Sequence, residues 1–128
     1  MDRDRVLDAY ERAWSEADED KVRAWIQECW TSSSTYVNPL TDMVRGVDGL
    51  ARLILDYRDI FPDVDIRPCA PADIVDQHAR WPWRLSSTVR IRMLGKDYGH
   101  VMDGLDIIEF DDDGKIKKVV SFFGSTAG

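Results

Sequence analysis

Apolar side chains recur every three or four positions in three stretches of the chain, at residues 6–17, 22–30 and 48–61. This spacing gathers them on one face of a helix, so the pattern predicts three amphipathic helices. The third stretch is the most hydrophobic and ends at Pro62. We therefore expect this third helix to pack against something large.

The segment between the second and third helices has a different pattern. The hydroxyl-rich run Thr31–Thr35 predicts the end of the second helix. Tyr36–Pro39 and Met43–Arg45 predict two short strands, the first ended by a proline that cannot donate into a ladder.

Beyond Pro62 the pattern becomes strand-like, with prolines and glycines between extended segments. Pro82 interrupts one of these segments, so the boundaries between Ile74 and Leu94 stay open. Asp112-Asp113-Gly114 predicts a tight hairpin turn, which would place Asp106 opposite Val119. The expected strands are Val64–Cys69, Ile74 to about Leu85, Thr88–Leu94, Tyr98–Phe110 and Lys115–Phe123.

Helices followed by a meander of long strands predict an α+β fold. We expect a cone-shaped, curved antiparallel sheet wrapped around the three N-terminal helices. Side chains that point into an incompletely filled cone would line a pocket. No internal repeat, low-complexity segment or linker divides the chain, so we expect a single domain over residues 1–128.

Composition and charge narrow the classes of partner. The 128 residues are 44% hydrophobic and 32% charged, and the formal net charge is −7. A negative charge does not suit a surface that binds the phosphate groups of nucleic acids or lipids, so we expect neither nucleic acid nor an anionic membrane as a partner. Thirteen aromatic residues, five Trp, four Tyr and four Phe, predict a bulky core.

Cysteine usage and the N-terminal pattern bear on the compartment. Cys29 and Cys69 form no CxxC pair, so we expect neither a disulfide framework nor a metal site. The N-terminus leads directly into an amphipathic pattern rather than a signal peptide, and no apolar run approaches the ~20 residues that cross a bilayer. We expect a cytoplasmic protein.

Asp106 is the most informative polar residue. Strict alternation puts it on one face of its strand, among apolar neighbours. Burial there would raise the pKa of the carboxyl group and suit it to acid–base chemistry near neutral pH. The alternative is a solvated carboxylate at an open edge or a cap on a backbone group. The residues that share its face are His100, Met102, Gly104, Ile108 and Phe110.

Other candidates have plain structural interpretations beside the functional ones. His100 lies on the same face as Asp106, nearer the start of the strand, and a lone histidine is more often structural than catalytic. Tyr10 lies on a helix face with Trp14, where a core position is the default and its hydroxyl would need a partner if buried. Asn38 precedes Pro39, a common turn arrangement.

The ordered motifs along the chain resemble the nuclear transport factor 2-like superfamily, with its cystatin-like fold, and specifically its SnoaL-like branch. Each motif is weak alone, but their order and spacing cover nearly the whole chain. The motifs are the paired opening helices through Trp30, Tyr36-Val37-Asn38-Pro39, Arg45-Gly46 before the third helix, Phe61-Pro62-Asp63, Trp83-Arg84-Leu85, Gly104–Phe110, Asp113–Ile116 and Ser121–Gly124.

The resemblance implies roles for some residues. In ketosteroid isomerase, one member of the superfamily, a protonated Asp and a Tyr donate to a developing oxyanion, and these fall at Asp106 and Tyr10. Its proton-shuttling base falls at Asn38, where an amide cannot shuttle a proton. Limonene epoxide hydrolase spaces a Tyr and an Asn as Tyr36 and Asn38 are spaced, but its acid on the last strand, like that of SnoaL-type polyketide cyclases, falls at Ser121.

The sequence therefore predicts a SnoaL-like enzyme that performs cofactor-independent acid–base chemistry, of isomerase, cyclase or hydrolase type. Its substrate would be a small hydrophobic carbonyl, enol or epoxide. The alternative is a non-catalytic ligand-binding or protein-interaction domain of the same fold, favoured by the absence of an acid or base at Asn38 and Ser121. The expected catalytic residues are Asp106, Tyr10, Asn38 and His100, and the expected substrate-binding residues are Trp14, Tyr36, Met102 and Phe123.

The opposite face of the predicted sheet is also apolar. It would carry Val101, Leu105, Ile107, Val120 and Phe122, too much apolar surface to leave in water. Members of the superfamily commonly pair these faces, so we expect a homodimer.

Overall fold

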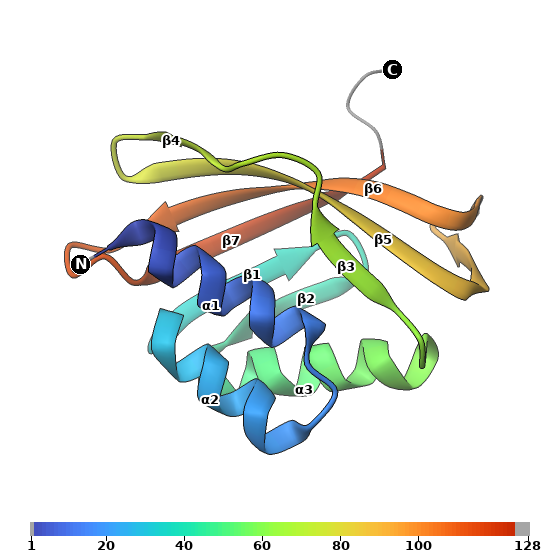
Figure 1. Cartoon of the computed structure of the whole chain (residues 1–128), viewed down its shortest axis with the longest axis horizontal. Coiled ribbons are helices and arrows are strands. Elements are labelled where there is room, and N and C mark those ends of the chain that lie inside the picture. The colour runs from blue at the N-terminus through green and yellow to red at the C-terminus, as the bar shows by residue number, and fades with distance from the viewer. Residues whose placement is uncertain (1, 125–128) are drawn as a thin grey trace.

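The computed structural model describes residues 2–124 and has three helices and seven strands (Figure 1). The helices pack on one side of a curved sheet, and two long strands extend beyond them at one end. In chain order the elements are α1 (Arg3–Ser15), α2 (Glu19–Cys29), β1 (Trp30–Asn38), β2 (Thr41–Arg45), α3 (Gly46–Ile60), β3 (Asp65–Pro68), β4 (Asp73–Val75), β5 (His78–Met93), β6 (Lys96–Phe110) and β7 (Ile116–Phe123).

Side-chain caps fix where the first two helices begin. Asp2 accepts a hydrogen bond from the backbone N–H of Asp4, and Asp18 accepts one from Lys21 at 3.1 Å. Three helices were expected from the periodicity, and all three are present. Their apolar faces pack on the sheet and on one another, and the core residues Ala13, Ile26 and Leu50 are fully buried.

The sheet order is β2-β1-β7-β6-β5-β3, and β4 pairs with β5 at the far end. The α+β fold class is confirmed. The sheet differs from a purely antiparallel one at a single pair, because β1 and β7 run parallel. Since these strands come from opposite ends of the chain, the pairing brings the N-terminal and C-terminal segments together in the middle of the sheet.

The second helix ends at Cys29, just before the hydroxyl-rich run Thr31–Thr35, as expected. The strand expected from Tyr36 begins earlier than that, because β1 already starts at Trp30 and includes this run. The pairing of β1 with β7 is irregular between Trp30 and Thr35, and side chains satisfy the backbone there. The Ser34 hydroxyl donates to the carbonyl of Ile116 at 2.6 Å and accepts from the N–H of Thr31 at 2.9 Å. The hydroxyls therefore support a bulged strand.

The segment between Ile74 and Leu94, whose boundaries stayed open, contains the end of the short strand β4 and then one continuous strand, β5, which runs through Pro82. On one flank of β5, β4 pairs with residues 78–80 and β3 with residues 83–86, which leaves a gap at Pro82. The carbonyl of Pro82 faces this gap and accepts from Cys69 N–H at 2.9 Å. A missing N–H on the same side breaks no ladder bond, so the proline is tolerated.

The register expected for the last hairpin was also wrong. Asp106 pairs with Ser121, not with Val119. The loop is longer than a two-residue turn, because the side chain of Asp111 accepts from the N–H groups of Asp113 and Lys115 and holds a wider connection. An irregularity beside Phe110 adds a further one-residue shift.

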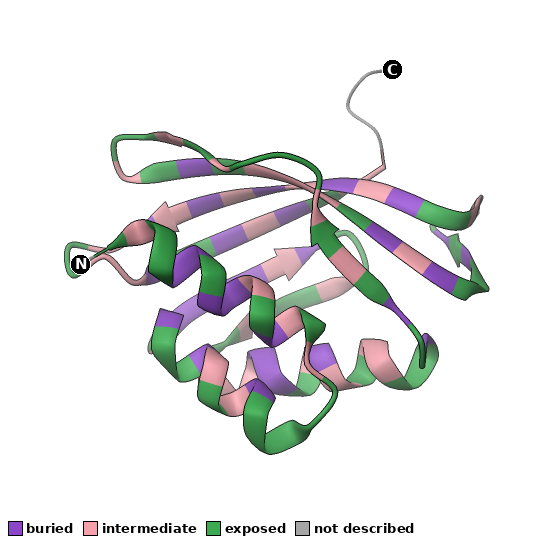
Figure 2. Ribbon diagram, viewed as in Figure 1, coloured by how far each residue is buried: buried purple, intermediate pink, exposed green. Residues whose placement is uncertain are grey.

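Burial alternates along β6, as Figure 2 shows by its purple and pink bands. From Met102 to Phe110 the even-numbered residues are buried against the helices, and the odd-numbered ones are half-buried on the outer face. The strand therefore presents Asp106 to the interior, as its alternation predicted.

Candidate functional site

A cavity of about 70 Å³ lies between the sheet and α1. Aromatic side chains are the largest group in its wall, while Asp106 and Ser121 bring polar groups from β6 and β7. The lining residues are Tyr10, Glu11, Trp14, Tyr36, Tyr57, Ile66, Arg67, Pro68, Trp81, Trp83, Leu85, Met93, Met102, Asp106, Ser121 and Phe123. A small, largely apolar compound matches such a lining.

Asp106 is 8% exposed and accepts hydrogen bonds from side chains of β5 and β7. The indole N–H of Trp83 donates to its Oδ1 at 2.9 Å. Burial raises the pKa of Asp106 to about 6, although hydrogen bonds from Ser121 and Trp83 favour the charged form and limit the rise. A carboxyl group with this pKa can both accept and release a proton near neutral pH.

Two buried donors in the cavity wall have no hydrogen-bond partner. These are the hydroxyl of Tyr10 and the indole N–H of Trp14, both on α1. Burial, and after it the negative charge of Asp106, holds the pKa of Tyr10 well above its ordinary value, so the hydroxyl keeps its proton. Buried donors without partners are unfavourable, and a ligand oxygen in the cavity would satisfy them.

Trp14 is also the centre of an aromatic cluster. Its ring centroid lies 5.6 Å from that of Tyr36, 6.1 Å from that of Tyr57 and 6.4 Å from that of Tyr10. Tyr10 in turn stacks on Trp30 at 6.0 Å. These contacts join α1, β1 and α3 around the cavity and leave the rings little freedom to turn.

Asn38 lies behind the cavity wall and orients two tyrosines. Its Oδ1 accepts from the N–H groups of Leu40 and Thr41, which settles the orientation of the amide. Its Nδ2 donates to the hydroxyl oxygens of Tyr36 at 3.3 Å and Tyr57 at 2.9 Å. Because both hydroxyls accept from Asn38, their own protons are free to be donated elsewhere.

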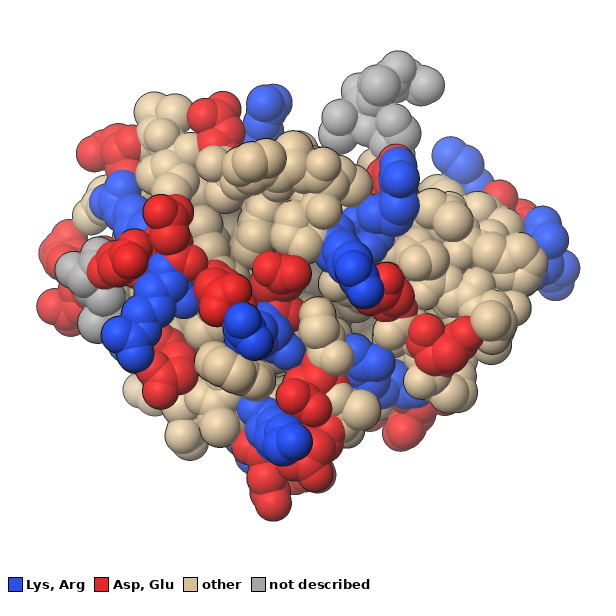
Figure 3. Space-filling model, in the orientation of Figure 1, with Lys and Arg blue, Asp and Glu red and all other residues tan. Residues whose placement is uncertain are grey.

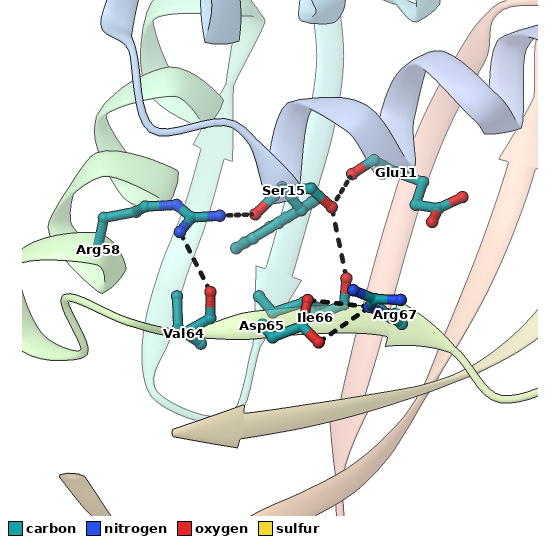
Figure 4. Close-up of polar contacts among 8 residues, drawn as sticks. Glu11, Ser15, Arg58, Val64, Asp65, Ile66 and Arg67 are labelled. Atoms are coloured by element: carbon teal, nitrogen blue, oxygen red, sulfur yellow. Dashed lines mark hydrogen bonds and ion pairs between the residues drawn. The ribbon is translucent and has the colours of Figure 1, made fainter. Parts of the chain in front are cut away.

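Around Ser15 and Arg58, polar contacts hold the end of α1 beside the cavity (Figure 4). Arg58 on α3 donates to the carbonyl of Trp14 at 2.9 Å and to that of Val64 at 3.2 Å. Ser15 reaches the carbonyl of Ile66 on β3 at 3.5 Å. These bonds tie α1, α3 and β3 together beside the cavity.

Known structures share this architecture. A SnoaL-like family protein from Agrobacterium tumefaciens, named as a candidate isomerase, is 28% identical with a TM-score of 0.78, over 94% of this chain and 95% of its own. A protein with a cystatin-like fold from Methylobium petroleophilum is 20% identical with a TM-score of 0.73, over 98% of this chain and 78% of its own. A protein with a ketosteroid isomerase-like fold from Catenulispora acidiphila, solved with trimethylamine, is 10% identical with a TM-score of 0.71, over 95% and 87%.

The chain has the fold of the nuclear transport factor 2-like superfamily and resembles the proteins of its SnoaL-like branch. No protein-family model matches the sequence, and no curated protein matches it significantly. The resemblance that the motifs suggested is therefore confirmed through the fold.

Most of the expected site residues lie together. Asp106 and Tyr10 line the cavity, and so do the four residues expected to bind substrate, which are Trp14, Tyr36, Met102 and Phe123. Asn38 is buried but does not line the cavity; it reaches it through Tyr36. Their functional roles remain proposals.

His100 does not lie in the cavity, which contradicts its expected place beside Asp106. Val101 pairs with Ser86, but the next pair is Gly99 with Ile91, so four residues of β5 bulge opposite His100. The imidazole is exposed and its Nδ1 lies 3.1 Å from the carbonyl of Ser87 in this bulge. Counting by twos fails across such an irregularity.

The sequence reasoning missed several lining residues, and three of them bring hydrogen-bonding groups to the site. Tyr57 was assigned only to the third helix, Ser121 was noted only for the acid it replaces, and Trp83 lay in the segment interrupted by Pro82. Gly104 could have pointed to Trp83, because a glycine amid a buried strand often marks the close approach of another group.

The rim of the cavity carries both signs of charge, with Glu11 on α1 and the exposed Arg67 on β3. On the face drawn in Figure 3, acidic and basic side chains are interspersed over the helices, and uncharged surface gathers over β4 and β5. Among residues 2–124, no cluster of three His, Cys, Asp or Glu side chains could hold a metal ion. Within the same range, every helix is too short or too polar to cross a membrane.

Proposed function

We propose that this SnoaL-like protein is an enzyme that moves a proton on a small, largely hydrophobic compound, a carbonyl, enol or epoxide, without a cofactor. One observation carries the proposal. A buried carboxyl group with a pKa near neutrality, that of Asp106, shares an aromatic cavity with two unpartnered donors, Tyr10 and Trp14. Perturbed titratable groups of this kind are typical of catalytic sites.

For a carbonyl substrate the step is an enolisation. Asp106 as carboxylate takes a proton from the carbon beside the carbonyl, the C–H bond breaks, and its electron pair moves to the oxygen. The hydroxyl of Tyr10 and the N–H of Trp14 donate to this oxygen as it gains charge. Return of the proton from Asp106 to another carbon would give an isomer. Each such donor can be worth ~3–4 kcal/mol of the barrier.

In this proposal Asn38 is a positioning residue rather than a base. It holds the hydroxyl oxygens of Tyr36 and Tyr57, so that their protons face other partners. Tyr36 lines the cavity and its hydroxyl keeps its proton, because burial and the charge of Asp106 raise its pKa. Tyr36 is then a third donor for substrate or water.

Hydrogen exchange tests the proposal without knowledge of the natural substrate. Acetophenone and cyclohexanone in D₂O would be incubated with the protein, and loss of the α-proton signals followed by NMR. We expect the protein to accelerate exchange and Asp106→Asn to lower the rate by about 100-fold or more, as for loss of a general base. Asp103→Asn, on the outer face of the same strand, is the matched control and should keep the rate. Exchange that persists in Asp106→Asn would contradict the proposal.

The alternative is a non-catalytic domain that binds a small molecule in the same cavity. Two observations favour it. Ser121 stands at the position where SnoaL-type cyclases carry an acid, and the N–H of Trp83 already donates to Oδ1 of Asp106. Phenol would serve as the probe, with binding followed by the fluorescence of the cavity tryptophans. Saturable binding with no exchange of either ketone would favour this alternative over the enzyme.

We further propose that the protein works as a cytoplasmic homodimer formed through the outer face of the sheet. Val101 and Phe122 are each 49% exposed there, beside the half-buried Leu105, Ile107 and Val120. Light scattering at micromolar concentration should give twice the chain's mass, and Phe122→Ser should lower it. A wild-type monomer would contradict the dimer.

A further inference from the structure

Trp83 reaches Asp106 by lying across a glycine. Trp83 on β5 is the direct partner of Gly104 on β6, two residues before Asp106 on the same face. A Cβ atom at Gly104 would lie 2.0 Å from Cζ2 and 2.3 Å from Cε2 of the indole. Only glycine leaves room for the ring, which then extends along β6 until its N–H meets Oδ1 of Asp106 at 2.9 Å.

A second aromatic ring holds the indole in this position. Phe123 on β7 is the partner of Gly104 on its other side. The rings of Trp83 and Phe123 meet edge to face, with centroids 5.8 Å apart and planes at 86°. Three neighbouring strands thus place two large rings over one glycine, which limits the rotation of Trp83.

We infer that Trp83 is a positioning residue for Asp106, and that Gly104 exists at its position to admit the indole. The inference rests on the proposed function, since Asp106 is the base in that proposal. The Trp83 N–H fixes one carboxylate oxygen in place. In the proposed step the proton from the substrate goes to Oδ2, the oxygen that Trp83 does not bind.

The hydrogen bond also predicts an effect on ionisation. An N–H donor stabilises the carboxylate more than the protonated carboxyl group, so it opposes the effect of burial. Without this donor Asp106 would hold its proton at higher pH, and fewer molecules would carry the base at a given pH. A residue that only filled space would have no such effect.

Trp83→Phe is the first test, because it removes the N–H and keeps a ring over Gly104. The matched control is Trp81→Phe. Trp81 lines the same cavity, but its indole N–H donates to the carbonyl of Ala70 at 3.1 Å instead of to Asp106. The pKa of Asp106 would be followed by carboxyl ¹³C NMR in each protein, which needs no substrate.

We expect Trp83→Phe to raise the pKa of Asp106 by about 1 or more, as for loss of a hydrogen bond to a charged group. Trp81→Phe should leave it in place. At a pH below the wild-type pKa of Asp106, the Trp83→Phe protein should exchange ketone protons about tenfold more slowly than wild type, because a smaller fraction of its Asp106 is carboxylate. An unchanged pKa in Trp83→Phe would overturn the inference.

Gly104→Ala is the second test and approaches the contact from the other side. Its methyl group displaces the indole, so it should raise the pKa of Asp106 in the same direction as Trp83→Phe. If Asp106 in a folded Gly104→Ala protein kept the same pKa as in wild type, the inference would also be overturned. The two proposals fail separately. If Trp83→Phe raises the pKa of Asp106 but the wild-type protein does not exchange the ketones, only the proposed enzyme activity is removed. If the wild-type protein exchanges the ketones but Trp83→Phe leaves the pKa of Asp106 unchanged, only the positioning role of Trp83 is removed.

Discussion

Asp103 and Asp106 are three residues apart on β6 and point to opposite faces of the sheet. Asp103 accepts from Arg84 at 2.7 Å on the outer face, and this contact lowers its pKa. Asp106 faces the apolar cavity, and burial raises its pKa to about 6. The pKa values of two identical side chains on one strand are thus shifted in opposite directions, because the alternation of the strand places them in different surroundings.

The raised pKa makes a prediction about stability. The pKa of Asp106 in the unfolded chain is about 3.9, so its carboxyl group is protonated in both states below that pH and unfavourably charged in the folded state above about 6. Its contribution to folding is therefore lost as pH rises through 6. Asp106→Asn should gain about 3 kcal/mol relative to wild type between about pH 4 and pH 7.5, measured by urea unfolding.

Asp103→Asn provides the opposite control. The lowered pKa of Asp103 means that its carboxylate stabilises the folded protein above the unfolded pKa and that this is lost as pH falls. Relative to wild type, Asp103→Asn should thus become less stable as pH rises from acid to neutral. An Asp106→Asn protein that also lost relative stability over this range would contradict the buried carboxylate.

Tyr10→Phe should separate binding from stability. The hydroxyl has no partner in the folded protein, so its removal should leave the free energy of unfolding unchanged or raise it by up to about 1 kcal/mol. The same change should weaken phenol binding by about tenfold, because a donor to the ligand is lost. Urea unfolding and tryptophan fluorescence measure the two effects.

Tyr57→Phe is the matched variant for this test. Its hydroxyl accepts from Asn38 at 2.9 Å, so its loss should lower stability by about 1 kcal/mol. Equal destabilisation by Tyr10→Phe and Tyr57→Phe would mean that the Tyr10 hydroxyl is already bonded within the protein.

Asn38 should tolerate aspartate better than leucine. Aspartate keeps an oxygen for the N–H groups of Leu40 and Thr41, and it can accept from the hydroxyls of Tyr36 and Tyr57. Leucine leaves all of these groups without a partner, so Asn38→Leu should lose about 3 kcal/mol of stability. Thermal unfolding of the two variants would be compared; equal losses would show that the hydrogen bonds of Asn38 matter little.

The sequence predicted the parts of the site that depend on regular periodicity. The helical spacing put Tyr10 and Trp14 on the buried face of α1, and the alternation of β6 put Asp106 and Met102 inside. It failed where the ladder is irregular. His100 lies beside a four-residue bulge of the partner strand, which no count along β6 reveals.

Contacts between strands could not be predicted from the sequence for a related reason. The register of the β6–β7 hairpin depends on a loop held by Asp111, so the pairing of Asp106 with Ser121 could not be counted from the turn residues. The approach of Trp83 to Asp106 depends on that kind of pairing too, since it requires Gly104 directly opposite. Such relationships follow from three-dimensional register rather than local pattern.

The measurement that tests the central claim most directly is the titration of the Asp106 carboxyl carbon by ¹³C NMR in the wild-type protein, assigned by its absence from Asp106→Asn. Asp103 in the same spectrum is the internal reference, and its midpoint should lie below its ordinary value. We predict a midpoint of about 6 for Asp106. A midpoint near ~3.9, that of an ordinary solvated aspartate, would contradict a buried base in this cavity.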